Sequence, residues 1–293
     1  MKVGLGTAQF GLDYGISNHD GQVAPVEALK ILDLAERAGV RVLDTAAAYG
    51  DSEERLGEML ATDHPFSIVT KLSRLPEGLT SSATTRWVQD AVAQSLRRLR
   101  TDHVRGLLVH DVGDLLGARG TDLWHALESV RDAGTVEKIG ASLYTAAEID
   151  ALLERHRPQL VQVPLNVFDQ RLILSGHLAH LKTAGVEVHS RSSFLQGLLL
   201  MDPTELSDPY FEPARGALDA FRTAARATGY SPLQAAVSFV MSLDEVDVTM
   251  FGVINEGQLA EILSATTLRL PSDWFMPFSL DDVSILNPAL WPP

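Results

Sequence analysis

The segment VLDTAAAYGDSEERLGEML, Val42 to Leu60, joins an apolar run, an aspartate, a loop of small residues, a tyrosine and a helical pattern. It predicts one strand–loop–helix unit, with Asp44 at the strand end, Tyr49 in the loop and a helix beginning near Ser52. Taken alone, Asp44 could be a helix cap and Tyr49 could be surface filler. The meaning of the pair therefore depends on what the other strand ends carry.

The same unit recurs along the chain. Short runs of β-branched and aliphatic residues alternate with longer stretches of helical periodicity, which predicts strands and helices in turn. Four of the helical patterns stop at glycines, as helix ends commonly do: Gly39, Gly134, Gly185 and Gly229. The expected strands are KVGLGTA (2–8), VRVLDTA (40–46), FSIVTKL (66–72), VRGLLVH (104–110), VEKIGAS (136–142), LVQVPLN (160–166), VEVHSRS (186–192) and VDVTMFG (246–252).

About eight such units in 293 residues have the size and order of a single α/β domain, a (β/α)8 TIM barrel spanning residues 1–293. A doubly wound sheet with a small second domain is the alternative, but the alternation continues from end to end without a linker-like break. The active site of a TIM barrel lies at the carboxyl-terminal ends of its strands. Two irregular segments, near 200–215 and 270–293, are expected to cover that end.

The composition is 45% hydrophobic, enough for a sizeable core, and it includes no cysteine. Disulfides, thiolate chemistry and Cys-bound zinc are therefore excluded. The formal net charge of -14 argues against nucleic acid and anionic membrane as partners. The N-terminus lacks the apolar core of a signal peptide, and no segment approaches a membrane span. We expect a cytoplasmic protein with no nucleic-acid or membrane partner.

The glycine-containing segment GLGTAQFG, residues 4–11, invites a dinucleotide-fold interpretation. The G-x-G-x-x-G spacing fails, because Gly4 and Gly6 are followed by Gln9 where a third glycine is required, and the next residues are loop-like. Gly6 is more simply a place where the backbone approaches a ligand at a strand end.

Polar side chains end three successive strands. Asp44 ends VRVLD, Lys71 ends FSIVTK and His110 ends VRGLLVH. Each has a plain structural explanation alone: a carboxylate bound to loop amides, an exposed loop charge, a histidine on the rim. Because neighbouring strand ends converge at one end of a barrel, we expect these three residues and Tyr49 to form one site.

This set of side chains predicts proton transfer to or from an oxygen. A tyrosine hydroxyl is a poor proton donor at neutral pH, and a lysine ammonium beside it favours the phenolate. Asp44 supplies the counter-charge that a partly buried Lys71 needs. His110 can orient a carbonyl oxygen and share the proton load. With Tyr49 as the proton donor, the site suits hydride addition to a carbonyl or its reverse, which needs a hydride carrier but no metal.

The chain resembles the aldo-keto reductases almost from end to end. LDTAAAYGDSEERLG is similar to the family's signature, VTK and LLVHD to its lysine and histidine segments, and GLGTAQFG, VEKIGAS and LVQVPLN to its first, fifth and sixth strand ends. The resemblance implies that Asp44, Tyr49, Lys71 and His110 form a catalytic tetrad, with Tyr49 as the general acid or base.

The resemblance also implies a nicotinamide cofactor extended across the rim, NADP(H) with NAD(H) possible, and no metal. Ser142 and Gln162 match the positions that hold the carboxamide, and Gly6 and Thr7 match a backbone contact near the nicotinamide ribose. The other implied cofactor residues are Asp44 near the ring, Arg191 in the place of a stacked aromatic ring, Ser192 and Phe194 along the pyrophosphate, and Gly252, Asn255 and Gln258 around the adenosine phosphate.

Three features depart from the family pattern. Leu143 replaces an asparagine that would face the carboxamide. Gly252 and Gln258 stand where members that prefer NADP often have Lys and Arg, which a 2′-phosphate favours. The chain enters its first strand at Lys2 without the usual β-hairpin over the barrel floor. The preference between NADP and NAD therefore stays open at this point.

Rim residues suggest a substrate class. Phe10 and Tyr14, with Tyr49 and His110, are expected to contact substrate. Further aromatic and acidic residues on predicted rim loops either line the pocket or pack the loops; together they hint at a polyol or sugar: Phe168, Tyr210, Phe211, Asp13, Asp111 and Asp169. His177 and His180 have a metal-compatible spacing without a third ligand, so a solvated helix face is expected.

The sequence thus predicts an NAD(P)(H)-dependent oxidoreductase that interconverts a carbonyl (aldehyde, ketone or sugar) and its alcohol, with a role in carbohydrate metabolism. A cofactor-binding barrel that serves as a redox sensor or partner subunit with little turnover is the alternative. A metal- or phosphate-dependent barrel lyase or isomerase is a third, for which we find no ligand set. The sequence leaves open the physiological substrate, the direction of the reaction and the oligomeric state.

Overall fold

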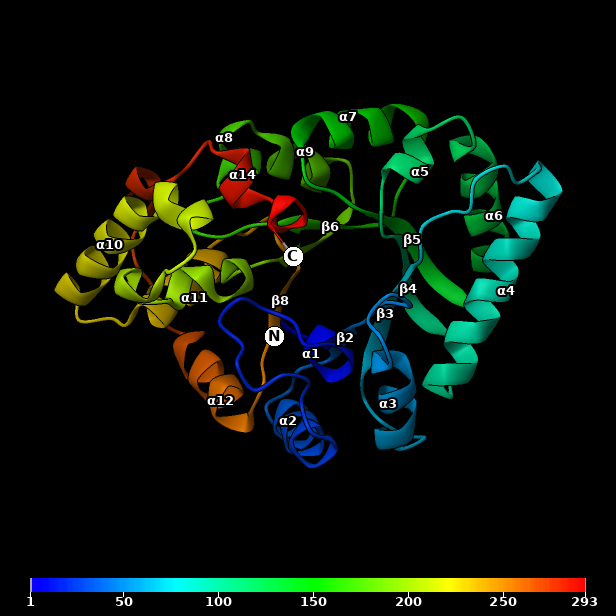
Figure 1. Ribbon diagram of the computed structural model, residues 1–293. Helices are drawn as coiled ribbons and strands as arrows, with labels where there is room; N and C mark the ends of the chain where they lie inside the picture. The colour runs from blue at the N-terminus through cyan, green and yellow to red at the C-terminus, as the bar shows by residue number, and fades with distance from the viewer. Residues whose placement is uncertain (1, 293) are drawn as a thin grey trace.

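The computed structural model describes residues 2–292, whose eight parallel strands close into one barrel in chain order (Figure 1). The predicted (β/α)8 barrel is confirmed. Met1 and Pro293, the ends of the predicted 1–293 domain, lie outside the described residues. The strands are β1 (Val3–Gly6), β2 (Val42–Asp44), β3 (Ser67–Leu72), β4 (Val104–Val109), β5 (Val136–Ser142), β6 (Leu160–Pro164), β7 (Glu187–Arg191) and β8 (Val248–Gly252).

Helices surround the barrel on its outside (Figure 1). The glycines predicted to end helices, Gly39, Gly134, Gly185 and Gly229, all have positive φ. The longer helices are α2 (Pro25–Arg37), α3 (Ser52–Met59), α4 (Ser81–Leu99), α6 (Gly120–Asp132), α7 (Ala146–Arg155), α9 (His177–Thr183), α10 (Glu212–Ala227), α11 (Pro232–Met241) and α12 (Glu256–Ala265). The one-turn helices are α1 (Ala8–Gly11), α5 (Gly113–Leu116), α8 (Arg171–Leu174), α13 (Ser272–Phe275) and α14 (Val283–Leu286).

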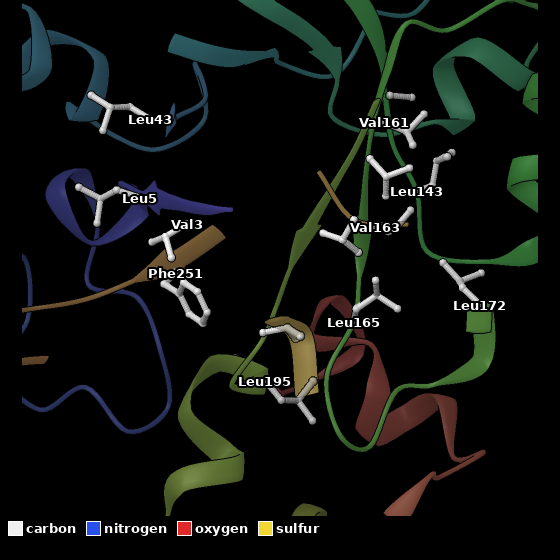
Figure 2. Packing of buried hydrophobic residues seen from close by; sticks show 14 of the residues in the cluster. Val3, Leu5, Leu43, Leu143, Val161, Val163, Leu165, Leu172, Leu195 and Phe251 are labelled. Atoms are coloured by element: carbon white, nitrogen blue, oxygen red, sulfur yellow. The ribbon is translucent and has the colours of Figure 1, made fainter. Parts of the chain in front are cut away.

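The main hydrophobic core lies between the outer faces of the strands and the helices. Successive strand residues point to opposite faces, so one alternate set faces the helices. Figure 2 shows members of this set, Leu5 on β1, Leu43 on β2, Val161 and Val163 on β6 and Phe251 on β8, all fully or almost fully buried. The opposite set faces the barrel interior, where Val69, Leu108 and Leu160 form a separate small cluster.

Ionic contacts lie among residues that begin three of the strands. Glu187 on β7 accepts hydrogen bonds from Arg105 of β4 (2.7 Å), Lys138 of β5 and His189 of β7 (2.8 Å). His189 is fully buried inside the barrel. This network lies at the amino-terminal ends of the strands, opposite the end where a TIM barrel carries its active site.

The two segments expected to cover the other end contain short helices and contact one another. The first includes the 3-10 turns η2 (Pro203–Glu205) and η3 (Pro209–Phe211), and the second includes α13, η4 (Met276–Phe278), α14 and η5 (Pro288–Leu290). The Tyr210 hydroxyl donates to the carbonyl oxygens of Ser284 (2.9 Å) and Leu290 (3.2 Å). The rings of Phe211 and Trp291 meet edge to face at 4.9 Å between centroids. The C-terminal segment is therefore tied to the segment that follows β7.

Candidate active site

At each of four strands, a predicted site residue lies two positions after an apolar residue that faces the barrel interior. Lys71 follows Val69 on β3, and His110 follows Leu108 just beyond β4. Asp44 likewise follows Val42 on β2, and Gln162 follows Leu160 on β6. Since alternate strand residues share a face, the apolar residues close the barrel below and place the polar side chains above them at the carboxyl-terminal rim.

Asp44 and Lys71 form a buried ion pair. The Lys71 ammonium donates to both carboxylate oxygens of Asp44, at 2.8 and 2.7 Å, and to the carbonyl of Thr45 at 3.0 Å. Their exposed fractions are 5% for Asp44 and 1% for Lys71. Burial opposes the lysine charge, but Asp44 and then Tyr49 outweigh it, so the pKa of Lys71 is raised. Lys71 is therefore a permanent cation at neutral pH.

Tyr49 lies against this cation. Its hydroxyl is 3.4 Å from the Lys71 ammonium, which also lies 4.8 Å from the centre of the tyrosine ring. The ring of His110 meets that of Tyr49 edge to face at 5.8 Å. Burial, followed by the charges of Lys71 and Arg191, lowers the pKa of His110 to about 4. His110 is thus neutral at pH 7 and suited to hydrogen bonding with an oxygen rather than to carrying a proton.

These side chains open into one large cavity of about 800 Å³. Its lining includes the predicted substrate and catalytic residues Tyr14, Tyr49, His110 and Asp44. It also includes most of the predicted cofactor residues: Gly6, Ser142, Gln162, Arg191, Ser192, Phe194, Gly252 and Gln258. Burial raises the pKa of Tyr14 to about 12, so its phenol stays protonated. The barrel rim thus brings together nearly the whole set that the sequence predicted.

Two buried polar atoms in this lining have no hydrogen-bond partner among residues 2–292. Gln162 donates its amide nitrogen to Asp44 at 2.8 Å, which leaves its carbonyl oxygen unpaired, and the Ser193 hydroxyl is also unpaired. Buried polar atoms without partners are uncommon and often mark ligand contacts. A nicotinamide carboxamide supplies an N–H₂ donor for an oxygen such as that of Gln162. The residues present therefore fit the cofactor that the sequence implies.

Besides Lys71, which is buried beside Tyr49, three predicted residues do not line the cavity. Phe10, expected to contact substrate, is instead fully buried in the hydrophobic core. It lies in the one-turn helix α1, where the sequence predicted a loop after β1. Thr7 is also fully buried, and its hydroxyl donates to the Asp44 carbonyl at 2.9 Å. Asn255 caps α12 through the amide of Gln258 (2.9 Å). Thr7 and Asn255 therefore support neighbouring segments instead of bordering the cavity.

The wider aromatic and acidic set behind the sugar hint mostly packs the structure. Phe168 and Phe211 are buried in the core, and Tyr210 ties the C-terminal segment. Asp169 is buried and paired with Arg171 at 2.8 Å, while Asp13 and Asp111 are exposed and outside the cavity lining. His177 contacts Asp150 at 3.2 Å on the outer surface.

Several cavity residues were missed by the sequence analysis. Tyr144 lies two residues beyond Ser142, and the Arg191 guanidinium carbon is 4.1 Å from the centre of its ring. The alternation along β5 is a signal that could have found Tyr144. Arg222 of α10, Glu261 of α12 and Pro288 of the C-terminal segment also line the cavity. They come from helices and loops, where the alternation of a strand is absent and so cannot indicate which way a side chain points.

The segment after β7 has an unusual backbone. Ser192, Leu195 and Gln196 have φ values of 61°, 50° and 54°, in the left-handed region that favours glycine. Such conformations cost about 1 kcal/mol or more each and cluster at functional sites. Ser192 and Gln196 both line the cavity. This strained turn folds the chain over one side of the cavity.

The Aldo/keto reductase family matches residues 2–276, so the chain belongs to this family. It is accordingly an NAD(P)-dependent oxidoreductase of the kind that acts on carbonyl compounds. Members of this family typically use NAD(P)H. Within residues 2–292, no helix is long and apolar enough to cross a membrane, and no cluster of three or more His, Cys, Asp or Glu side chains forms a potential metal site.

Characterised relatives and solved structures extend this comparison. The chain is 30% identical over 281 residues to L-galactose dehydrogenase of Arabidopsis thaliana, covering 90% of this chain and 84% of that protein. It is 26% identical to 6-dehydroglucose reductase of Novosphingobium aromaticivorans, covering 86% and 84%. The glycerol dehydrogenase AKR11B4 from Gluconobacter oxydans superposes with a TM-score of 0.70 at 24% identity, covering 100% and 94% of the two chains. The aldo-keto reductase AKR11C1 from Bacillus halodurans gives 0.75 at 19% identity, covering 95% and 92%. At these identities the two structures establish the fold alone.

Proposed function

We propose that this enzyme interconverts a carbonyl group and its alcohol with Tyr49 as the general acid or base. One observation carries the proposal: Tyr49 lines the cavity, its hydroxyl lies 3.4 Å from the Lys71 ammonium, and Asp44 holds that cation in a buried pair. A cation at this distance stabilises the phenolate that remains after the tyrosine has given up its proton.

The other side chains of the site have supporting roles. Neutral His110 donates one N–H to the carbonyl oxygen and orients it toward the Tyr49 hydroxyl. Gln162 and Ser142 hold the carboxamide of the nicotinamide, and Ser192 and Phe194 lie along the pyrophosphate. The bound nicotinamide supplies or accepts the hydride. In the reductive direction, Tyr49 protonates the oxygen as negative charge develops on it, and Lys71 stabilises the resulting phenolate.

The substrate class that we propose is a sugar or related polyol carbonyl, which places the enzyme in carbohydrate metabolism. Two of the similar proteins are named for sugar substrates, L-galactose dehydrogenase and 6-dehydroglucose reductase. The cavity offers polar groups suited to several hydroxyls, because Tyr14 and Tyr144 both line it. Recognition of rings and hydroxyls by phenol groups fits a polyhydroxylated substrate.

We also infer that the enzyme prefers NADH to NADPH. The segment from β8 into α12, which the family pattern assigns to the adenosine phosphate, lines the cavity with Gly252, Gln258 and Glu261. It offers no lysine or arginine there for a 2′-phosphate, and the Glu261 carboxylate would repel one. Arg222 on α10, which also lines the cavity, is already paired with Asp202 at 3.2 Å.

The test combines binding and turnover. NADH and NADPH are titrated separately against the full chain, and a panel of aldehydes, ketones and sugars is then assayed with the tighter nucleotide. Tyr49→Phe should retain nucleotide binding but lose turnover by roughly 100-fold or more, because the proton donor is removed. Tyr230→Phe, which removes a hydroxyl from a partly buried residue outside the cavity lining, is the matched control. Full turnover in Tyr49→Phe would exclude the proposed role of Tyr49.

A further inference from the structure

Arg191 stands out because its charge has no counter-charge in the part of the chain that the structure describes. Its guanidinium lies over the Tyr144 ring and donates to the Leu143 carbonyl at 3.4 Å and the Ser192 hydroxyl at 3.3 Å. Among residues 2–292, no carboxylate forms an ion pair with it. A guanidinium is charged at every working pH. The stack and two long hydrogen bonds therefore hold an uncompensated cation in the cavity wall.

The surrounding groups leave this charge unbalanced. Asp44 and Lys71 cancel one another at 2.7 Å, and His110 is neutral because burial and nearby cations lower its pKa to about 4. The Tyr14 phenol is protonated, with a pKa raised to about 12 by burial. Asp111 is exposed to solvent and lies 3.9 Å from Arg74. The catalytic end of the cavity thus carries close to one net positive charge.

Arg191 is also close to the groups that fit the nicotinamide carboxamide. It ends β7, where it pairs in register with Pro164 of β6, two residues beyond Gln162. Its charge acts on both His110 and Tyr14. Any ring that meets the unpaired Gln162 oxygen and presents its reactive carbon near Tyr49 must therefore lie within the field of this cation.

We propose that Arg191 makes the site bind the reduced nicotinamide nucleotide more tightly than the oxidised one. The proposal rests on the function proposed above. The two forms differ in one respect that matters here: the oxidised ring is a cation and the reduced ring is neutral. Two like charges a few ångströms apart in a partly dry site repel strongly, and this repulsion acts at a distance without a specific contact. The reduced form loads tightly, and the oxidised product leaves readily.

The selection is measured as a ratio of dissociation constants without any turnover. NADH and NAD⁺ are titrated against the full chain by isothermal calorimetry, with NADPH and NADP⁺ as a second pair. The wild type should bind the reduced form about 10- to 100-fold more tightly than the oxidised form. Arg191→Gln should bring this ratio close to one, and Arg191→Lys, which keeps the charge, should preserve most of it.

A matched variant controls for overall charge. Arg37→Gln removes the same charge from an exposed position on α2, and its ratio should equal that of the wild type. Equal affinity of the wild type for both forms, or an unchanged ratio in Arg191→Gln, would overturn the selection while leaving the proposed function intact. Failure of every nucleotide to bind would overturn the proposed function and the selection together. Circular dichroism of each variant verifies folding.

Discussion

The ion pair of Asp44 and Lys71 also orients the residue expected to hold the cofactor. A buried ammonium is stable only with a close partner, and Asp44 supplies both of its carboxylate oxygens to Lys71. One of these oxygens also accepts from the Gln162 amide nitrogen at 2.8 Å. The Gln162 carbonyl oxygen must consequently face away from Asp44. The same carboxylate therefore fixes a proton-transfer group and a binding group.

The neutral state of His110 predicts the pH dependence of the reaction. Burial is the largest cause that lowers its pKa to about 4, and the charges of Lys71 and Arg191 lower it further. The folded-state pKa lies below the ordinary value of 6.5, so the imidazole stays neutral from pH 8 to about pH 5. We expect kcat/KM for carbonyl reduction to show no histidine transition near pH 6.5, and to fall only as the pH approaches 4.

The measurement is a kcat/KM profile from pH 4.5 to 8.5 at saturating reduced nucleotide. The His110 ring can be followed in parallel by NMR, with a His110→Gln variant to assign its signals. A transition near pH 6.5 that disappears in His110→Gln would contradict the neutral state inferred from burial.

The strand-end residues of the site could be predicted from the sequence. Asp44, Lys71 and His110 each end an apolar run, and barrel closure brings neighbouring strand ends together. Thr7 was expected inside the first strand, but β1 ends at Gly6. Phe10 lies in the loop-like segment that follows, where the sequence does not indicate which way a side chain points. Phe10 turns into the core and Thr7 toward the backbone of β2.

At the scale of elements, close contact between α1 and the start of α3 positions Tyr49. A Cβ built on Gly11 of α1 would lie 1.8 Å from the Tyr49 carbonyl oxygen and 2.6 Å from the Ser52 amide nitrogen. Only a residue without a side chain fits there. The Ser52 hydroxyl, in turn, donates to the Thr7 carbonyl at 2.9 Å. The loop that carries Tyr49 is therefore fixed by backbone contact.

Gly11→Ala should disturb both stability and catalysis. The added methyl group meets backbone that cannot move away as a flexible side chain would, so α1 and the Tyr49 loop must separate. We expect a loss of about 1–3 kcal/mol in the free energy of unfolding, and a fall in kcat of roughly 10-fold or more as Tyr49 shifts from Lys71. Urea unfolding and steady-state assays measure the two effects.

A second glycine provides the control. Gly216 lies inside α10, and a Cβ there would meet nothing within 4 Å. Gly216→Ala should raise the free energy of unfolding by up to about 1 kcal/mol through helix propensity and leave kcat unchanged. If Gly11→Ala behaved like Gly216→Ala, the contact between α1 and α3 would have no role in positioning Tyr49.

Element boundaries were only partly predictable. Thr145 caps α7 through a full capping box with Glu148, a motif that the sequence itself shows because both partners lie within one turn. In contrast, α6 begins at Gly120 after Arg119 without a side-chain cap, so no capping residue marks its start in the sequence. The 3-10 turns near 200–215 depend on long-range contacts such as that between Phe211 and Trp291, which no local pattern encodes.

At the scale of the whole molecule, the two ends of the barrel have separate roles. The carboxyl-terminal end holds the cavity, and the amino-terminal end holds the ionic network around Glu187, with the apolar cluster of Val69, Leu108 and Leu160 inside the barrel. The network could not be predicted from the sequence, because Arg105, Lys138 and Glu187 lie far apart along the chain on separate strands. Stability and chemistry should consequently be separable by mutation.

Glu187→Gln tests this separation. Burial alone would raise the pKa of Glu187, but hydrogen bonds from His189 and Lys138 and the charge of Arg105 outweigh it and hold the pKa well below 4.5. The carboxylate thus stabilises the fold fully above the unfolded-state pKa near 4.5, and this contribution is lost as the pH falls from there toward the lower folded-state value. We expect Glu187→Gln to lower the free energy of unfolding by about 1–3 kcal/mol at pH 7, and by clearly less at pH 3.5.

The kcat and KM of Glu187→Gln should match the wild type, since the network lies at the opposite end of the barrel from Tyr49. Urea unfolding of both proteins at the two pH values, with assays at pH 7, measures this. A deficit as large at pH 3.5 as at pH 7 would show that packing, and not the carboxylate charge, stabilises this end of the barrel.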